Sequence, residues 1–183
     1  TARDLAWLRE NGLAAKIRSV AEQGVPVMGI CGGFQMMGER IRDPRGVESG
    51  TKSVRGLGLL PVETVLRTEK TTHRALAEVE RAVGLLKYAE GCRFTGYEIH
   101  MGHTAGDGEA AFRLKTRSGR SADQPDGVLA GSCGHLLGTY LHGLFRSPAI
   151  RRSVIDYARL RPVRRDGTRN GEPVPVGRGP GSR

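Results

Sequence analysis

Aromatic side chains and long apolar runs are scarce in this 183-residue sequence. Aromatics make up 5% of it, which is little for the stacking platforms that bind single-stranded nucleic acids. No apolar run approaches the roughly 18 residues that a membrane-spanning helix needs. Asp4, Arg9 and Glu10 interrupt the start of the chain, which therefore does not resemble a secretory signal. We expect a cytoplasmic protein with neither membranes nor nucleic acids as its main partner.

Cysteine is also rare, and the chain contains Cys31, Cys92 and Cys133. An odd number of cysteines without a signal peptide favours a reducing compartment and at least one free thiol. Cys133 and His135, with His100 and His103, are the residues from which a zinc site could be assembled. Their spacings match no common zinc pattern, so we expect no metal site in this chain.

The formal net charge of +10 is unevenly spread. Residues 151–183 hold nine arginines against three acidic residues, which predicts at most a weak polyanion-binding tail. From residue 162 onward glycine, proline and arginine dominate without periodic apolar positions. Such a segment cannot offset its ordering entropy by burial. The sequence thus predicts one domain over 1–161 and a disordered basic tail over 162–183.

Apolar spacing predicts alternating helices and strands. Residues 5–23 have a helical period, with Gly12 as a point of interruption and Gly24 as a stop. Residues 25–30 form a short β-branched run typical of a buried strand. This order indicates an α/β domain with a mostly parallel sheet flanked by helices. Further predicted elements are a helix from Phe34, strands over 63–66, 94–101, 111–115 and 136–141, and a last helix that Ser147 caps and Pro148 begins.

The sequence Gly29-Ile30-Cys31-Gly32-Gly33 places a cysteine at a tight turn between a strand and a helix. Such a turn is a nucleophile elbow with sulfur in place of the serine oxygen. The helix N-terminus favours a thiolate, and the N–H of Gly32 is placed to stabilise an oxyanion. The alternative is that Cys31 is a small core residue beside a glycine-rich turn.

A cysteine nucleophile needs a base, and the chain has five histidines. His142 ends a predicted strand, so it can share with Cys31 the carboxyl edge where catalytic groups gather in α/β sheets. His100 also ends a strand, with Glu98 two residues before it on the same face. We favour His142 over His100, and we interpret the remaining histidines, His73, His103 and His135, as solvated.

Several stretches resemble known sequences. GICGGFQMMG at 29–38 is similar to the nucleophile segment of class I glutamine amidotransferases, which have a flavodoxin-like fold. The closer resemblance is to the amidotransferase domain of the cobyric acid synthase family, and it spans about residues 1–160. It is carried by DLAWLR at 4–9, RDPRGVES at 42–49, GLGLLPVET at 56–64, GYEIHMGHT at 96–104 and GTYLHGLF at 138–145.

The resemblance implies that Cys31 attacks the side-chain amide of glutamine and that His142 shuttles the protons. It also implies that the domain lacks its first strand, which in the family precedes Thr1. A separate N-terminal synthetase domain would use ATP and Mg²⁺ to activate carboxylates of a corrinoid substrate, adenosylcobyrinic acid a,c-diamide. No phosphate-binding loop of the form G-x-x-x-x-G-K-[ST] occurs in this chain, so we expect no cofactor here.

Some points stay open at this level. The His-Pro-Glu sequence common in class I enzymes is replaced by His142-Gly143-Leu144, so the group that orients the imidazole is not identified. Gln35, Tyr97, Glu98 and His100 are candidates for lining the glutamine site or for packing beside it. Other interpretations are a glutaminase of lipid II isoglutaminyl synthase, a cobyrinate a,c-diamide synthase, an inactive binding module and a cysteine protease.

Overall fold

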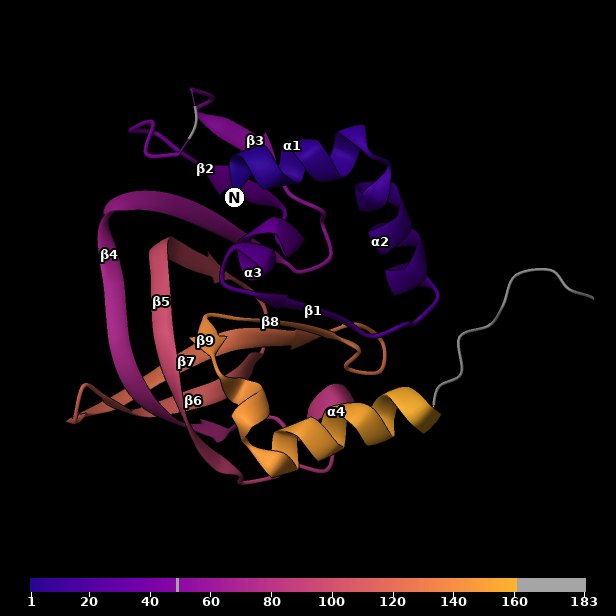
Figure 1. Ribbon diagram of the computed structural model, residues 1–183, viewed down its shortest axis with the longest axis vertical. Helices are drawn as coiled ribbons and strands as arrows, with labels where there is room; N and C mark the ends of the chain where they lie inside the picture. Colours follow the sequence, from indigo (N-terminus) through magenta and orange to yellow (C-terminus); the bar gives the residue numbers. More distant parts are fainter. Residues whose placement is uncertain (49, 161–183) are drawn as a thin grey trace, which may run out of the picture.

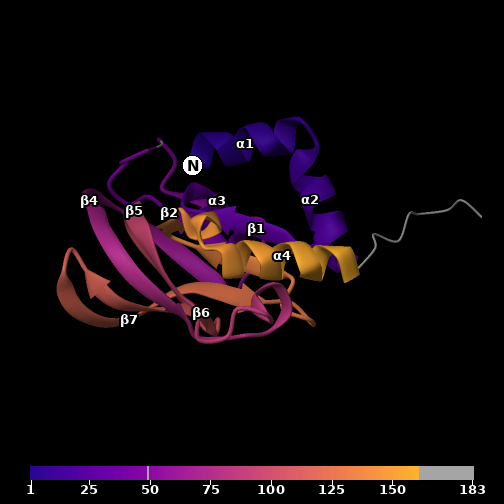
Figure 2. The same cartoon turned by 60° about the horizontal axis from the view of Figure 1, so that its bottom comes forward.

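The computed structural model describes residues 1–48 and 50–160, which form one mixed sheet with helices packed on it. The α-helices lie at both ends of the sequence, and the long strands lie between them (Figure 1). In Figures 1 and 2 the N-terminal helices and the long central strands lie on opposite sides of the molecule. The helices are α1 (Ala2–Glu10), α2 (Leu13–Glu22), α3 (Gly32–Met37) and α4 (Pro148–Leu160), with the short 3₁₀ turns η1 (Gly84–Leu86) and η2 (Leu144–Arg146).

The sheet has the strand order β1-β8-β7-β6-β4-β2-β3, and β5 pairs with both β4 and β9. The strands are β1 (Val27–Ile30), β2 (Arg40–Arg42), β3 (Ser53–Arg55), β4 (Val62–Val79), β5 (Arg93–Gly106), β6 (Ala110–Arg117), β7 (Arg120–Ala130), β8 (Leu136–Thr139) and β9 (Leu141–His142).

The predicted helix over 5–23 is two helices, and the break falls where the sequence placed it. Gly12 has φ +70°, a left-handed conformation that suits glycine and separates α1 from α2. Gly24 follows the end of α2 with φ +79°, as expected of a helix stop. At the other end of the domain α4 begins at Pro148, and the Ile150 N–H lies 3.5 Å from Ser147 Oγ.

The sheet is mixed, whereas the sequence predicted mostly parallel strands. Among the strands described, β1 with β8 and β2 with β4 are parallel, and the other pairings are antiparallel. The reason lies between residues 62 and 142, where η1 is the sole helical segment. Tight connections such as Ser118–Gly119, between β6 and β7, can join only antiparallel strands.

Strand β4 was underestimated and β7 was missed because their sequences are polar, and the three-residue strands β2 and β3 were also not predicted. β4 is 18 residues long, although only 63–66 were predicted, since the charged residues that follow hide its alternation. Its pairing with β5 shifts between Val65 and Lys70, an irregularity of the kind that bends a strand. β7 contains Gln124 and Pro125, which are unusual inside a strand, and it was not predicted.

Strand β8 is buried on both faces and separates two parts of the core. Leu137 belongs to the cluster beneath α4 and η1, whereas its neighbour Leu136 belongs to the cluster beneath α2 and α3. Consecutive strand residues point to opposite faces, so each face of β8 has its own helical cover. The short strand β1 pairs alongside it, with Ile30 opposite Thr139. The residue that follows β1 is therefore held against the best-buried strand of the domain.

Candidate active site

Cys31 stands between β1 and α3 in a strained conformation. Its φ of 55° and ψ of −113° are rare for a residue with a side chain. Its N–H donates to Thr139 O at 2.9 Å, which continues the parallel pairing of β1 with β8. A Cβ on Gly29 would lie 2.6 Å from the backbone of Gly33, so the turn closes tightly only because residue 29 is glycine. The elbow expected from the sequence is present.

Gly32 and Gly33, the other glycines of the elbow, differ in their contacts. Gly33 supplies the backbone that approaches Gly29, and a Cβ on Gly33 itself would meet nothing within 4 Å. Gly32 begins α3 directly after the thiol. Burial raises the pKa of the Cys31 thiol above its ordinary value, while the backbone N–H of Gly32 acts in the opposite direction. The same N–H is available to an oxyanion that forms next to the sulfur.

The thiol donates a hydrogen bond to a main-chain carbonyl. Cys31 Sγ lies 3.1 Å from Ile99 O on β5, which holds the sulfur in its protonated form. A thiolate would lose this contact, because a carbonyl oxygen cannot donate a hydrogen bond to it. In this arrangement the Cys31 sulfur is therefore a protonated thiol that donates to the main chain.

His142 lies at the same edge of the sheet as Cys31. The parallel strands β1 and β8 end side by side, and β9 continues from β8 after a single residue, Tyr140. β9 pairs with β5, with His142 opposite Tyr97. The Nε2 atom of His142 is buried and has no hydrogen-bond partner in the part of the chain that is described. No hydrogen bond joins this ring to Cys31, whose sulfur is engaged at Ile99.

Both ring nitrogens of His100, the competing base, are hydrogen-bonded to groups other than Cys31. Its Nδ1 lies 2.9 Å from Gly102 O, and its Nε2 lies 3.0 Å from Glu98 Oε1. Glu98 is 2% exposed and also accepts a hydrogen bond from Arg117. Burial acts to raise the pKa of Glu98, but the bonds from His100 and Arg117 outweigh it and the pKa is lowered. This cluster leaves no ring nitrogen of His100 free to serve Cys31.

The two remaining candidates for the glutamine site differ in exposure. Gln35 is 3% exposed, and its Nε2 donates to Met101 O at 2.9 Å and to the Tyr140 hydroxyl at 3.2 Å. Its amide is thus occupied by protein groups. Tyr97 is 44% exposed next to His142 in the strand register, where a ligand can reach it.

Asp126 and Thr139 shape the break between β8 and β9, and neither was singled out from the sequence. Thr139 donates its hydroxyl hydrogen to Asp126, and the same oxygen accepts the Leu141 N–H at 3.0 Å. Asp126 is 6% exposed, and burial raises its pKa to about 6. The only sequence signal was the Asp126-Gly127 pair, which is typical of a turn.

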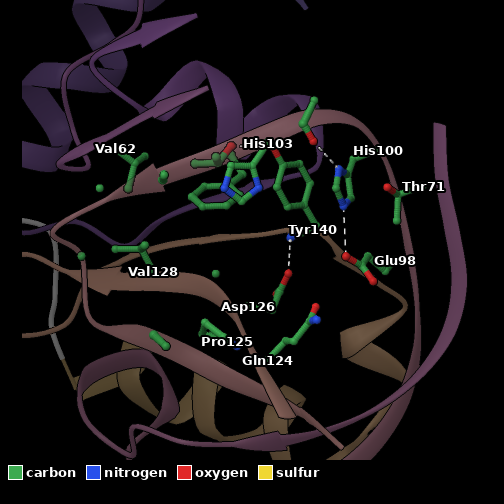
Figure 3. A pocket seen from close by; sticks show the side chains of 18 of the residues that line it. Val62, Thr71, Glu98, His100, His103, Gln124, Pro125, Asp126, Val128 and Tyr140 are labelled. Atoms are coloured by element: carbon green, nitrogen blue, oxygen red, sulfur yellow. Dashed lines mark hydrogen bonds and ion pairs between the residues drawn. The ribbon is translucent and has the colours of Figure 1, made fainter. Parts of the chain in front are cut away.

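A pocket of about 650 Å³ opens behind this region (Figure 3). His100 and Tyr140 lie side by side along one wall, and Asp126 faces them from below. The lining includes neither Cys31 nor His142. Its lining comes mainly from β4 to β7 and also includes Phe34 of α3.

The residues considered for zinc are not assembled into a site. Within 1–48 and 50–160, no group of three or more His, Cys, Asp or Glu side chains is placed to hold a metal ion. His135 is buried and its Nε2 lies 3.0 Å from Ala21 O, so it is a core residue rather than a solvated one. None of the described helices is long and apolar enough to cross a membrane. The tail predicted over 162–183 lies outside the described residues.

Comparison with solved structures supports the fold. A structure described as a glutamine amidotransferase aligns with a TM-score of 0.53 and 23% identity over 84% of this chain and 72% of its own. The PurLQS structure from Thermotoga maritima aligns with a TM-score of 0.56 and 20% identity over 79% of this chain and 68% of its own. At these identities the likeness concerns the fold, and it agrees with the class expected from the sequence.

Sequence comparison identifies the family. Cobyric acid synthase from Moorella thermoacetica is 43% identical over 162 residues, which are 88% of this chain and 31% of that protein. Cobyric acid synthase from Desulfitobacterium hafniense (strain DSM 10664 / DCB-2) is 40% identical over 92% of this chain and 31% of its own length. The chain thus spans about a third of these relatives. The family model described as a CobB/CobQ-like glutamine amidotransferase domain matches residues 1–150, and the chain belongs to that family of glutamine amidotransferases.

Proposed function

We propose that this chain hydrolyses glutamine, with Cys31 as the nucleophile and His142 as the base. The observation that carries the proposal is the placement of the strained Cys31 elbow beside β8, whose continuation β9 bears His142. Both residues follow parallel strands at one edge, where catalytic groups of α/β domains gather. The unpartnered Nε2 of His142 is available to take a proton.

The reaction follows from these groups. The Cys31 thiol leaves Ile99 O and transfers its proton to His142 Nε2, and the thiolate attacks the side-chain carbonyl carbon of glutamine. The Gly32 N–H stabilises the resulting oxyanion. His142 then protonates the leaving nitrogen, the C–N bond breaks, and ammonia departs from a glutamyl thioester. A water that gives its proton to His142 attacks the thioester, which releases glutamate and restores the thiol.

The backbone that carries His142 is fixed by main-chain pairing. The carboxylate that follows the histidine in many class I enzymes is replaced by glycine and leucine. The pairing of His142 with Tyr97 and the turn built by Thr139 and Asp126 fix the backbone on either side of the imidazole. The proposed chemistry therefore uses a Cys-His dyad on a fixed backbone.

The relatives are cobyric acid synthases, and this name suggests where the ammonia goes. We propose that a synthetase part outside this chain uses ATP and Mg²⁺ to activate carboxylates of adenosylcobyrinic acid a,c-diamide, which the ammonia then converts to amides. The described residues contain no cluster that could hold a metal ion, and the sequence has no phosphate-binding loop of the type named above. In this proposal the corrinoid binds to that other part, and glutamine is the substrate of this domain.

Covalent labelling tests the nucleophile directly. The glutamine analogue 6-diazo-5-oxo-norleucine alkylates a reactive active-site thiol, and mass spectrometry locates the adduct. We expect a single adduct on Cys31, none in Cys31→Ser, and slower labelling in His142→Ala. Glutamine added before the reagent should protect the thiol.

Two comparisons make the result decisive. The His73→Gln variant serves as the control for His142→Ala, because His73 lies on β4 with its Nδ1 3.0 Å from Ser118 Oγ in an exposed contact, and its loss should have little effect on labelling. Adducts on Cys92 or Cys133 would overturn the site, and an unlabelled wild-type protein would favour the inactive binding module.

A further inference from the structure

Tyr140 is the single residue between β8 and β9, the strand that contains His142. It follows Thr139, the last residue of β8, and precedes β9. Its side chain is 6% exposed, and its hydroxyl accepts a hydrogen bond from Gln35 Nε2 at 3.2 Å. Gln35 lies one helical turn after the nucleophile, with its N–H bonded to Cys31 O at 3.1 Å. One buried hydrogen bond therefore joins the elbow helix to the segment that carries the base.

The hydroxyl is fixed on its other side as well. Tyr140 Oη lies 2.5 Å from Thr104 Oγ1 on β5, and Gln35 Nε2 makes a second bond, to Met101 O, also on β5. Burial raises the pKa of Tyr140, so its hydroxyl remains protonated at neutral pH and can donate to Thr104 while it accepts from Gln35. The elements α3, β5 and the β8–β9 segment meet at this one oxygen.

The ring of Tyr140 cannot easily turn away from this position. It stacks on His100 with 3.9 Å between centroids and an interplanar angle of 22°. Phe34 of α3 packs edge-on against it at 5.1 Å. His100 is itself held between Gly102 O and Glu98. Because the Tyr140 ring is packed on both sides, it keeps the distance between α3 and the β8–β9 segment constant.

We infer that Tyr140 is a positioning residue, whose hydroxyl sets the spacing between Cys31 on the elbow and His142 on β9. The inference rests on the glutaminase proposed above. Cys31 and His142 share no direct bond in this arrangement, so their approach depends on how firmly α3 and β9 are held to each other. Small misplacements of reacting groups reduce rates strongly, by up to about 100-fold for 1 Å.

The test compares two tyrosines that each lose only a hydroxyl. Tyr140→Phe keeps the ring and its packing but removes the bonds to Gln35 and Thr104. Tyr157→Phe is the matched control, since Tyr157 is 7% exposed on α4 and its hydroxyl donates to Cys133 O at 3.1 Å, in the other part of the core. For each protein we would measure the thermal midpoint, the rate of Cys31 labelling by 6-diazo-5-oxo-norleucine across pH, and kcat and KM for glutamine.

A positioning role and a structural role give different patterns. We expect both variants to show similar thermal midpoints, while Tyr140→Phe alone labels roughly 10-fold more slowly and loses kcat with little change in KM. Its labelling should also reach half-maximum at higher pH, because a more distant His142 stabilises the thiolate less. Equal labelling in wild type and Tyr140→Phe, or losses that follow the thermal midpoint in both variants, would refute the inference. A wild-type protein that is not labelled at Cys31 would instead refute the glutaminase itself.

Discussion

Asp126 is a carboxyl group that the fold places almost entirely out of water. Its side chain accepts hydrogen bonds from the hydroxyl of Thr139 and the N–H of Tyr140, and burial is the largest influence on its pKa. A charge in such a position is costly unless it is well compensated, and the nearby carboxylate of Glu98 adds repulsion. The residue that shapes the turn before His142 is therefore also sensitive to pH.

Asp126→Asn should remove a specific part of the pH dependence of stability. The pKa of Asp126 is about 6 in the folded chain against an ordinary value of 3.8. A raised pKa means that the folded state binds the proton more tightly, so its stabilising contribution is full below pH 3.8 and is lost as pH rises to about 6. Relative to Asp126→Asn, the wild-type free energy of unfolding should fall across this window by up to about 3 kcal/mol.

Urea denaturation of both proteins at several pH values between 3 and 8 measures the difference. Subtraction removes the titration of the groups that do not interact with Asp126. Parallel curves for the two proteins would show that Asp126 does not carry the shifted proton. Above about pH 6.5 the difference should be constant, since Asp126 is then ionised in both states.

At the level of residues, the sequence suggested Cys31 and His142 as the catalytic pair but gave no indication of the contacts around them. The elbow could be predicted because glycines on both sides of a cysteine after a β-branched run are a local signal. Asp126, Thr139 and Tyr140 could not, because their roles depend on contacts with residues far away in the sequence. Gln35 was considered for substrate, whereas its amide is bonded within the protein.

The elbow as an element depends on how closely α3 approaches β1. Gly29 lies under the first turn of α3, where an added Cβ would lie 2.6 Å from Gly33 C, Gly33 O and Met37 Sδ. Backbone atoms cannot move aside as a flexible side chain can, so the helix would have to lift away from the strand. Gly33, four residues later, has open space at the position of a Cβ.

Gly29→Ala and Gly33→Ala make a matched pair for this contact. We expect Gly29→Ala to destabilise the domain by about 1–3 kcal/mol or more and to slow labelling of Cys31. Gly33→Ala should be neutral or stabilise by about 0.5–1 kcal/mol, because alanine replaces glycine within a helix without a clash. Urea denaturation of the two variants, with labelling rates, distinguishes them, and equal losses of stability would show that close packing at residue 29 is not the cause.

Among the secondary-structure elements, those with local signals could be predicted and those with tertiary causes could not. The break at Gly12, the stop at Gly24 and the start of α4 at Pro148 all follow from residues at the site of the event. The length of β4 and the existence of β7 depend on pairing with other strands, and charged residues obscure their period. The excess of antiparallel strand pairs also has a tertiary cause, because short connections between consecutive strands force them to be antiparallel, whatever their composition.

At the scale of the whole molecule, the residues of the described core lie in the sequence between the start of α1 and the end of α4. Three apolar clusters account for the described core, one against α4, one against α2 and α3, and one around α1 and β2. The sequence predicted that residues 162–183 add nothing to such clusters, since they lack periodic apolar positions. That segment does carry five arginines against two acidic residues, so its contribution should be to charge.

Removal of residues 162–183 should therefore weaken polyanion binding and leave the stability of the domain unchanged. A chain of residues 1–161 is expected to keep the urea midpoint and the Cys31 labelling rate of the full chain, because its apolar core is unchanged. Its retention on a heparin column should fall, and the salt needed for elution should decrease, because exposed arginines are the groups that neutralise a polyanion. A drop in the urea midpoint would mean that the segment packs on the domain. Unchanged heparin retention would place the polyanion-binding charge on the folded part instead, where acidic residues are interleaved with the basic ones and weaken such binding.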